Sequence, residues 1–290
     1  MTKQFEDVDW NSEVLDESKI NFIKISPKIE IRYYRSFLHS ENTPTILFVH
    51  GFGLFMDSYA PFILALNKYF NVIALDNPGH GYSSELANYS LDFILHAIQS
   101  FISHQRLTDF HIVGHSLGGY LAICLRSLYP GNCLVAITPA GIEVVTSPLI
   151  KLAKNKTLNK VLRGCWKSTF KAILSKTSQL LEFQLPKQQE YDDIWYRKHI
   201  DKHRKYVNSQ LMYLRDFEFN GGEEVFLNIK DSRNLFILCI DDTYIDSAKV
   251  EKFVCDNQIG EVTWYDAIHQ ITQAIPHQLA QRVKSFILEK

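Results

Sequence analysis

Short apolar segments alternate with segments of helical spacing along most of this chain. The apolar runs are 45–49, 71–76, 110–113 and 133–137. The segments with apolar residues at helical intervals are 56–69, 90–105 and 120–129. Runs that are apolar throughout are typical of strands covered on both faces. This alternation therefore predicts a parallel sheet with helices on both faces, joined by right-handed crossovers.

Two further regions extend the pattern toward the ends of the chain. Residues 20–25 and 29–34 are rich in β-forming residues and are separated by Ser26-Pro27-Lys28, so they predict a hairpin of edge strands. Residues 1–18 are predicted to be a loose leader. Near the other end the pattern predicts a strand at 234–240, a helix at 247–256, a strand at 261–265 and a closing helix at 278–288.

The strand–helix alternation stops between residues 147 and 215. That segment contains helical and loop patterns but no clear strand. It predicts a helical cap at 147–215, inserted into a core made of residues 1–146 and 216–290. A chain of 290 residues is long enough for one large domain with such an insertion.

Composition narrows the class of protein. Hydrophobic residues make up 46% of the chain, which suits a globular protein with a sizeable core, and a formal charge of −1 gives no reason to expect a nucleic-acid partner. No apolar run approaches the roughly 20 residues that span a bilayer, and the N-terminus lacks an apolar signal core. The five cysteines are odd in number and widely spaced, which indicates reduced thiols. A cytoplasmic location is expected.

A candidate nucleophile stands where the run 110–113 meets the next helical segment. The junction reads Gly114-His115-Ser116-Leu117-Gly118, so the serine occupies a sharp strand-to-helix turn. The glycines on either side let strand and helix approach closely, which holds the serine hydroxyl above the edge of the sheet. The alternative interpretation is a glycine-rich turn with an incidental serine.

A serine hydroxyl needs a base within hydrogen-bond reach and a third group that orients the base. His269 follows the last predicted strand, which puts it at the same edge of the sheet as Ser116. The side chain of the adjacent His115 is expected to point away from the serine. The histidines expected at the surface are His199, His203 and His277.

Two adjacent carboxylates are candidates for the orienting acid. Asp241 and Asp242 both follow the strand predicted at 234–240. The alternative is that one or both cap the next turn or helix. Asp246, just downstream, is better interpreted as the N-terminal residue of a helix.

Backbone N–H groups near Ser116 are candidates for an oxyanion hole, which stabilises negative charge in acyl transfer. The N–H of Leu117 lies at the start of the helix that follows the serine. A second donor, the N–H of Phe52, is expected from His50-Gly51-Phe52-Gly53, the loop after the strand at 45–49. The alternative is that this loop is a plain strand-to-helix turn.

Four motifs, in this order, resemble those of the α/β-hydrolase superfamily, in the branch of serine hydrolases with a helical cap. They are His50-Gly51-Phe52-Gly53, Asp76-Asn77-Pro78-Gly79-His80-Gly81-Tyr82-Ser83, Gly114-His115-Ser116-Leu117-Gly118-Gly119 and Ala267-Ile268-His269. The resemblance covers about residues 20–146 and 220–290. It implies a mostly parallel, eight-stranded sheet with helices on both faces.

The chain departs from the family pattern at the acid. The family motif reads Gly-x-x-Asp-x-x-x-Pro, and matching its spacing selects Asp242, with Cys239 and Asp246 in place of glycine and proline. Ile268 stands where the family has glycine before its histidine. Some members carry the acid after an earlier strand, where Glu143 is the candidate. A serine nucleophile argues against the dehalogenase and epoxide-hydrolase branches, which use aspartate there.

The resemblance implies a serine hydrolase with no cofactor and no metal. Ser116 is expected to be the nucleophile, His269 the base and Asp242 the acid, with the oxyanion hole formed by Phe52 and Leu117. A carboxylic ester is the expected substrate. C–C bond hydrolysis, thioester cleavage and acyl transfer on the same triad are alternatives, and a non-catalytic binding protein is a further one.

The predicted cap is strongly basic, although the whole chain has a formal charge of only −1. Residues 147–215 contain 15 Lys and Arg against five Asp and Glu, a formal charge of +10, so the rest of the chain carries −11. One interpretation is a solvated helical lid. The other is an anionic partner at the cap, such as an acyl carrier protein, coenzyme A or a membrane surface, with a carrier-linked acyl methyl ester as one candidate substrate.

The apolar residues of the cap are expected either to line an acyl pocket or to pack the cap on the core. They are Leu149, Ile150, Leu152, Leu158, Val161, Leu162, Trp166, Phe170, Ile173 and Leu174.

Overall fold

One eight-stranded sheet forms the centre of the computed structural model, which describes residues 5–10, 12–37, 40, 42–145, 148–165 and 203–289. The strands lie in the order β1-β2-β4-β3-β5-β6-β7-β8. Their bounds are β1 (Ile20–Ser26), β2 (Ile29–Ser36), β3 (Thr45–Val49), β4 (Asn71–Leu75), β5 (His111–His115), β6 (Leu134–Ile137), β7 (Asn234–Asp241) and β8 (Glu261–Ile268). Strand β2 is antiparallel to both of its neighbours, and the pairs from β4 to β8 are parallel. This architecture confirms the predicted fold class.

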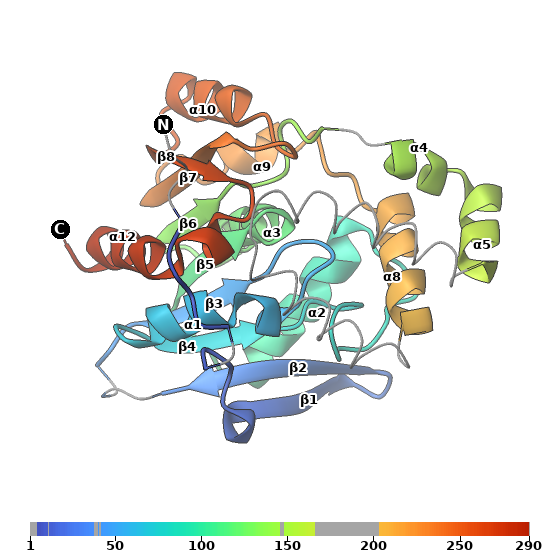
Figure 1. Ribbon diagram of the computed structural model, residues 1–290, viewed down its shortest axis with the longest axis horizontal. Coiled ribbons are helices and arrows are strands. Elements are labelled where there is room, and N and C mark those ends of the chain that lie inside the picture. The colour runs from blue at the N-terminus through green and yellow to red at the C-terminus, as the bar shows by residue number, and fades with distance from the viewer. Residues whose placement is uncertain are drawn as a thin grey trace.

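The helices connect these strands in the predicted rhythm (Figure 1). The described helices of the core are η1 (Glu17–Lys19), η2 (Met56–Tyr59), α1 (Ala60–Asn67), α2 (Leu91–His104), α3 (Leu117–Leu128), α9 (Glu223–Leu227), α10 (Ser247–Asp256), α11 (Ile271–Ala274) and α12 (Pro276–Leu288). The helix predicted at 56–69 is divided into η2 and α1. Pro61 lies in the first turn of α1, where its missing N–H costs no hydrogen bond.

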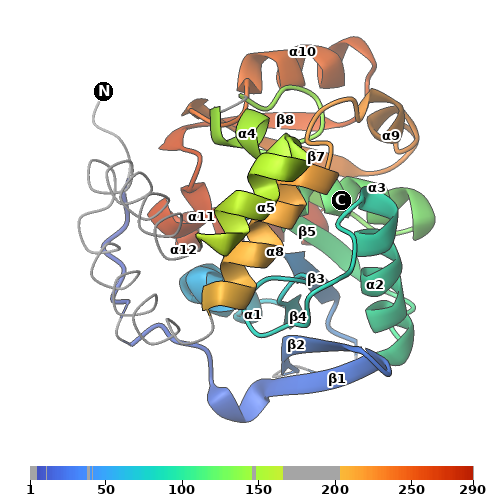
Figure 2. The same ribbon diagram turned by 90° about the vertical axis from the view of Figure 1, so that its right-hand side faces the viewer.

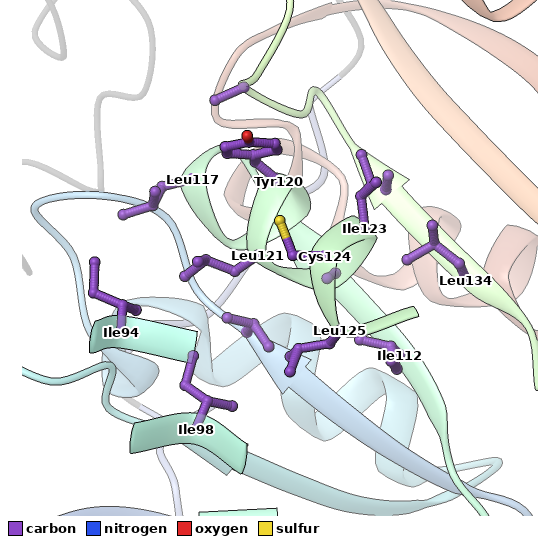
Figure 3. Close-up of a cluster of buried hydrophobic side chains, with 14 of the residues drawn as sticks. Ile94, Ile98, Ile112, Leu117, Tyr120, Leu121, Ile123, Cys124, Leu125 and Leu134 are labelled. Carbon is purple, nitrogen blue, oxygen red and sulfur yellow. The ribbon is translucent and has the colours of Figure 1, made fainter. Parts of the chain in front are cut away.

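Alternate side chains of the parallel strands feed two separate apolar layers. In β3, Ile46 and Phe48 pack with α1 and α12, whereas Leu47 and Val49 pack with α2 and α3. Figure 3 shows the second layer, in which side chains of α3 pack with Ile94 and Ile98 of α2 and with Ile112 and Leu134 of the sheet. Burial on both faces explains why these strands appear in the sequence as continuous apolar runs.

The prediction of a loose N-terminal leader is wrong for residues 5–10 and 12–18, and residues 1–4 and 11 lie outside the described residues. Trp10 and Leu15 are buried, and the N–H of Glu6 donates to the carbonyl of Ala274 at 2.8 Å. The carboxylate of Glu6 also accepts two backbone N–H groups in the first turn of α12, where a negative charge is favourable. These few apolar residues, spaced by polar ones, form no helix or strand pattern, so sequence periodicity carries no sign of the packing.

Three described helices belong to the predicted cap. They are α4 (Pro148–Lys154), α5 (Lys156–Gly164) and α8 (His203–Asp216), and they contact one another. They stand together at one side of the sheet in Figure 1, and Figure 2 looks onto that side. None of the described helices is both long and apolar enough to cross a membrane.

The cap predictions are tested only in part, because residues 166–202 lie outside the described residues. The side chains of Trp166, Phe170, Ile173 and Leu174 fall there, and that of Leu149 is also outside the description. The cap boundaries at 147 and 215 therefore stay a prediction.

Within the described part of the cap, the apolar side chains divide into two groups. Leu162 of α5 packs against Val207 and Leu211 of α8. Leu152, Leu158 and Val161 are 48%, 41% and 56% exposed, so they do not pack on the core, and a pocket-lining role for them stays a prediction. The buried face of α5 is set instead by Asn159, whose amide donates to the carbonyls of Ala153 and Leu211.

Candidate active site

Ser116 occupies a strained turn between β5 and α3. Its backbone has φ 56° and ψ −119°, a conformation that residues other than glycine rarely adopt. A Cβ on Gly114 would lie 2.1 Å from the carbonyl oxygen of Gly118, and a Cβ on Gly118 would lie 2.1 Å from that of Val49. The two glycines are therefore required by close contact, as the sequence predicted.

Three of the predicted residues form one hydrogen-bonded line. Nε2 of His269 lies 2.9 Å from Oγ of Ser116, and Nδ1 lies 2.7 Å from Oδ2 of Asp242. Ser116 follows β5, Asp242 follows β7 and His269 follows β8, so all three stand at the carboxyl edge of the sheet. Because the carboxylate accepts, Nδ1 carries the proton and Nε2 is free to accept from the serine hydroxyl.

The carboxylate of Asp242 is held on both oxygens. Oδ1 accepts the backbone N–H groups of Tyr244 and Ile245, each at 2.8 Å, while Oδ2 faces His269. Burial alone raises the pKa of Asp242, but the adjacent His269 and the backbone donors outweigh burial and hold this pKa below its ordinary value. The group is therefore a fixed anion at neutral pH.

The other candidate carboxylates for the orienting acid are Asp241, Glu143 and Asp246. Asp241 is the last residue of β7, and it is its neighbour Asp242 that bonds to His269. The carboxylate of Glu143 lies 3.1 Å from Nζ of Lys249, so it is paired away from the triad. Asp246 accepts the backbone N–H of Lys249 as the N-cap of α10, as expected.

The remaining histidines are placed as follows. His115 is buried, with its ring nitrogens bonded to Tyr59 and to the backbone of His269. His277 lies in the first turn of α12, where Nε2 is 3.2 Å from a carboxylate oxygen of Glu13. His199 and the side chain of His203 lie outside the described residues.

The loop after β3 carries the predicted second donor. The N–H of Gly51 donates to the hydroxyl of Tyr59 at 3.0 Å, and the N–H of Gly53 donates to Nε2 of His80 at 3.2 Å. The carbonyl of Gly53 accepts the hydroxyl of Tyr206 from α8. Within the described ranges, neither the N–H of Phe52 nor that of Leu117 is bonded to a protein acceptor. The assignment of both groups to an oxyanion hole stays a prediction.

A buried ion cluster supports this loop, and sequence reasoning missed it. The guanidinium of Arg32 lies between Asp57, at 3.0 Å from Nη2, and Asp76, at 3.2 Å from Nη1. Asp76 also accepts the backbone N–H groups of Met56 and Tyr82. The cluster joins the edge hairpin to the loops after β3 and β4. Its members are too far apart along the chain to form a sequence pattern.

Three histidines of the site region are buried and neutral. Burial lowers the pKa of His50 to about 4 and that of His115 to about 3, and it lowers the pKa of His80 well below the ordinary value of 6.5. Nε2 of His50 accepts the N–H of Asn77 at 2.8 Å, which requires an unprotonated ring nitrogen. Each ring thus serves as a neutral hydrogen-bonding group.

Acid is expected to destabilise the fold steeply for this reason. Below pH 6.5 the unfolded chain protonates these three histidines while the folded chain does not, so the free energy of unfolding falls as pH drops toward their folded pKa values. Three protons correspond to about 4 kcal/mol per pH unit at about pH 5. Urea unfolding between pH 7 and about pH 5 measures this slope.

Two variants calibrate that experiment. His115→Gln removes one of the three groups and is expected to reduce the slope by about a third. His96→Gln removes an exposed histidine of α2 and should leave the slope unchanged. A wild-type free energy of unfolding that stays constant over this range would contradict the neutral state of these histidines.

No group of three or more His, Cys, Asp or Glu side chains among the described residues is arranged to hold a metal ion.

Comparison with known proteins finds a matching family and several relatives of similar sequence. The model of the Alpha/beta hydrolase family matches residues 46–247. The dihydrolipoyllysine-residue acetyltransferase component of the acetoin cleaving system of Cupriavidus necator is 35% identical over 116 residues, covering 39% of this chain and 30% of that protein. A putative esterase/lipase of Haemophilus influenzae is 30% identical over 111 residues, covering 37% of this chain and 38% of that protein.

A solved structure extends the likeness over the whole fold. The enol-lactonase from Burkholderia xenovorans LB400 has a TM-score of 0.69 at 18% identity, covering 93% of this chain and 100% of that chain. At this identity the likeness concerns the fold alone. The matched region spans only 30% and 38% of the length of the two curated relatives.

Proposed function

The chain belongs to the Alpha/beta hydrolase family, and we propose that it is a serine hydrolase that cleaves a carboxylic ester through Ser116, His269 and Asp242. The observation that supports this most directly is the hydrogen-bonded line of 2.9 Å and 2.7 Å through the three side chains. A neutral imidazole between a hydroxyl and a buried carboxylate is the arrangement that activates a serine.

Acylation begins when Oγ of Ser116 attacks the ester carbonyl carbon. Nε2 of His269 accepts the hydroxyl proton as the bond to carbon forms. The N–H groups of Phe52 and Leu117 bind the oxyanion, and preorganised donors of this kind lower the barrier by about 3 kcal/mol each. Nε2–H then protonates the leaving alcohol, which departs and leaves an acyl-enzyme.

Deacylation repeats these steps with water. Nε2 of His269 removes a proton from a water molecule, whose oxygen attacks the acyl carbon. The same two N–H groups stabilise the second oxyanion. Collapse of this intermediate returns the proton from Nε2 to Oγ of Ser116 and releases the acid. Asp242 stabilises the imidazolium that forms in each half-reaction.

Acyl transfer differs from this scheme only in the acceptor. If an alcohol or thiol replaces water, the acyl group passes to it instead. The Cupriavidus necator relative is named an acetyltransferase component and the Haemophilus influenzae relative a putative esterase/lipase, so both outcomes belong in the test.

We further propose an anionic acyl donor, carried by an acidic protein, at the cap. Residues 148–165 contain no Asp or Glu. Lys151, Lys156 and Lys160 are exposed on α4 and α5, beside the exposed aliphatic side chains described above. A surface that combines positive charge with aliphatic contacts suits an acidic protein better than a small anion.

The location proposed for the enzyme is cytoplasmic, a proposal supported by the free thiols of Cys124, Cys133, Cys239 and Cys255.

The experiment that tests the ester proposal combines labelling with a substrate panel. A fluorophosphonate is expected to modify Ser116, identified by peptide mass spectrometry. Turnover is then measured on p-nitrophenyl esters of increasing chain length, a thioester, a β-diketone and an ester offered with an alcohol acceptor. Preferential ester hydrolysis supports the proposal, and labelling together with turnover of another class only would reassign the chemistry.

The cap proposal is tested in the same panel with a carrier-protein-linked methyl ester. Lys151→Gln, Lys156→Gln and Lys160→Gln together are expected to raise KM for this substrate about tenfold and to leave p-nitrophenyl acetate unaffected. The control triple variant neutralises three exposed lysines elsewhere, Lys24, Lys28 and Lys68. Equal KM values for both triple variants would make the basic cap a solvated surface.

A further inference from the structure

A buried chain of hydrogen bonds crosses the floor of the site. The N–H of Gly51 donates to the hydroxyl oxygen of Tyr59 at 3.0 Å. That oxygen lies 2.8 Å from Nδ1 of His115, and Nε2 of His115 lies 2.8 Å from the backbone carbonyl oxygen of His269. Tyr59 is 0% and His115 2% exposed, so water does not compete for these bonds.

Only one arrangement of protons satisfies every member of this chain. The carbonyl of His269 can only accept, so Nε2 of His115 must carry a proton. The ring is neutral, so Nδ1 has a lone pair and accepts the hydroxyl proton of Tyr59. The lone pair of the Tyr59 oxygen then accepts the N–H of Gly51. All bonds run in one direction, from the loop after β3 to the backbone of the base.

This chain of hydrogen bonds links three parts of the site to the imidazole of His115. His115 is covalently joined to Ser116, which adopts a strained backbone conformation. His269 is held through its own carbonyl, and the two rings lie 4.9 Å apart between centroids. Gly51 precedes Phe52, whose N–H is the proposed oxyanion donor. A shift of His115 or Tyr59 therefore changes the spacing of nucleophile, base and oxyanion donor together.

We propose that Tyr59 and His115 are positioning residues, which set the distance between the oxyanion loop and the base through Gly51 and the backbone of His269. This inference rests on the proposed function. Neither side chain touches the substrate or takes a proton in the reaction. Their contribution lies in geometry, where a misplacement of about 1 Å lowers the rate about 100-fold.

Tyr59→Phe tests the inference with a minimal change. It removes one hydroxyl, leaving Gly51 without its acceptor and Nδ1 of His115 without its donor. The expected result is a fall in kcat for p-nitrophenyl acetate of about 10- to 100-fold with KM within about twofold, because ground-state binding does not need the transition-state geometry. A folding effect alone would lower the active fraction, which active-site titration with a fluorophosphonate corrects.

The chain offers a closely matched control at Tyr89. Its buried hydroxyl accepts the backbone N–H of Leu86 at 3.0 Å and donates to Oγ of Ser209 at 3.0 Å. Tyr89→Phe thus removes one backbone and one side-chain hydrogen bond of a buried tyrosine hydroxyl away from the triad. It is expected to lower the melting temperature as Tyr59→Phe does and to keep kcat within about twofold. Equal losses of kcat in both variants would overturn the inference.

Replacement of His115 separates hydrogen bonding from packing. In His115→Gln the amide N–H can reach the carbonyl of His269 and the amide oxygen can accept from Tyr59, so part of the chain is restored. His115→Leu fills similar space and restores none of it. We expect the glutamine variant to exceed the leucine variant at least tenfold in kcat. Equal activity of the two variants would overturn the inference.

The closing measurement separates failure of the inference from failure of the proposed function. The second-order rate of phosphonylation of Ser116 is compared in wild type and Tyr59→Phe, because this reaction needs nucleophile, base and oxyanion hole but no ester substrate. A rate lower by at least tenfold in the variant supports the inference even if no ester is hydrolysed. Equal rates overturn the inference even if ester hydrolysis by the wild type stands.

Discussion

Replacing Ser116 by alanine is expected to lower kcat for a p-nitrophenyl ester by on the order of 10⁶-fold. The acyl-enzyme of the proposed mechanism cannot form without Oγ, and the imidazole of His269 then has no hydroxyl proton to accept. Residual turnover would come from the oxyanion donors acting on a water molecule. Steady-state kinetics on the purified variant measures the loss.

The variant should fold normally, since alanine retains the Cβ and loses only a half-buried hydroxyl. Ser103→Ala, at an exposed position of α2, provides the matched control and should retain full activity. Activity of Ser116→Ala within tenfold of the wild type, after removal of contaminating esterases, would refute the assignment of the nucleophile.

Asp242→Asn is expected to lower kcat about 10⁴-fold while the fold stays intact. Two backbone N–H groups, from Tyr244 and Ile245, point at Oδ1 from 2.8 Å, so the amide oxygen of the asparagine must take that position. Its NH₂ group then faces Nδ1 of His269. The imidazole is forced to carry its proton on Nε2, where it can no longer accept the proton of Ser116.

The neighbouring carboxylate makes the matched control. Asp241→Asn changes the same functional group one residue earlier, at the last position of β7, and is expected to keep kcat within about twofold. Kinetics on both variants, with ¹⁵N chemical shifts of the imidazole to identify its tautomer, provides the check. A larger loss in Asp241→Asn than in Asp242→Asn would reassign the acid.

Local pattern was sufficient for most of the fold. Strands covered on both faces leave apolar runs, and β3 to β6 were located in this way to within about two residues. The candidate serine was selected because its turn needs glycines in fixed positions, and the 2.1 Å contacts that a Cβ on either glycine would make show the steric reason. His269 was selected because parallel strands bring their carboxyl ends to one edge.

Local pattern could not decide between the adjacent carboxylates Asp241 and Asp242. Asp241 and Asp242 differ in sequence position by one, and both follow β7. Spacing matched to a family motif favoured Asp242, but the contact itself depends on which carboxylate turns toward β8. The hydrogen bond between Asp242 and His269 joins residues 27 positions apart, so the local sequence around the two aspartates does not determine it.

The prediction for the N-terminal segment was wrong because that segment has no local pattern to interpret. Its buried residues form no periodic pattern, because they fill a surface made by other parts of the chain rather than one face of a helix or strand. Glu6 meets the first turn of α12 across 271 residues.

The sequence by itself determined the order of strands and helices, the strained serine turn and the edge at which the candidate groups gather, because these follow from short-range burial periods and steric needs. Only the tertiary structure decided how those groups are held. The bond between Tyr59 and His115 spans 56 residues, and the bond between His115 and the carbonyl of His269 spans 154. A single polar contact between distant residues has no period, so it leaves no trace in a local pattern.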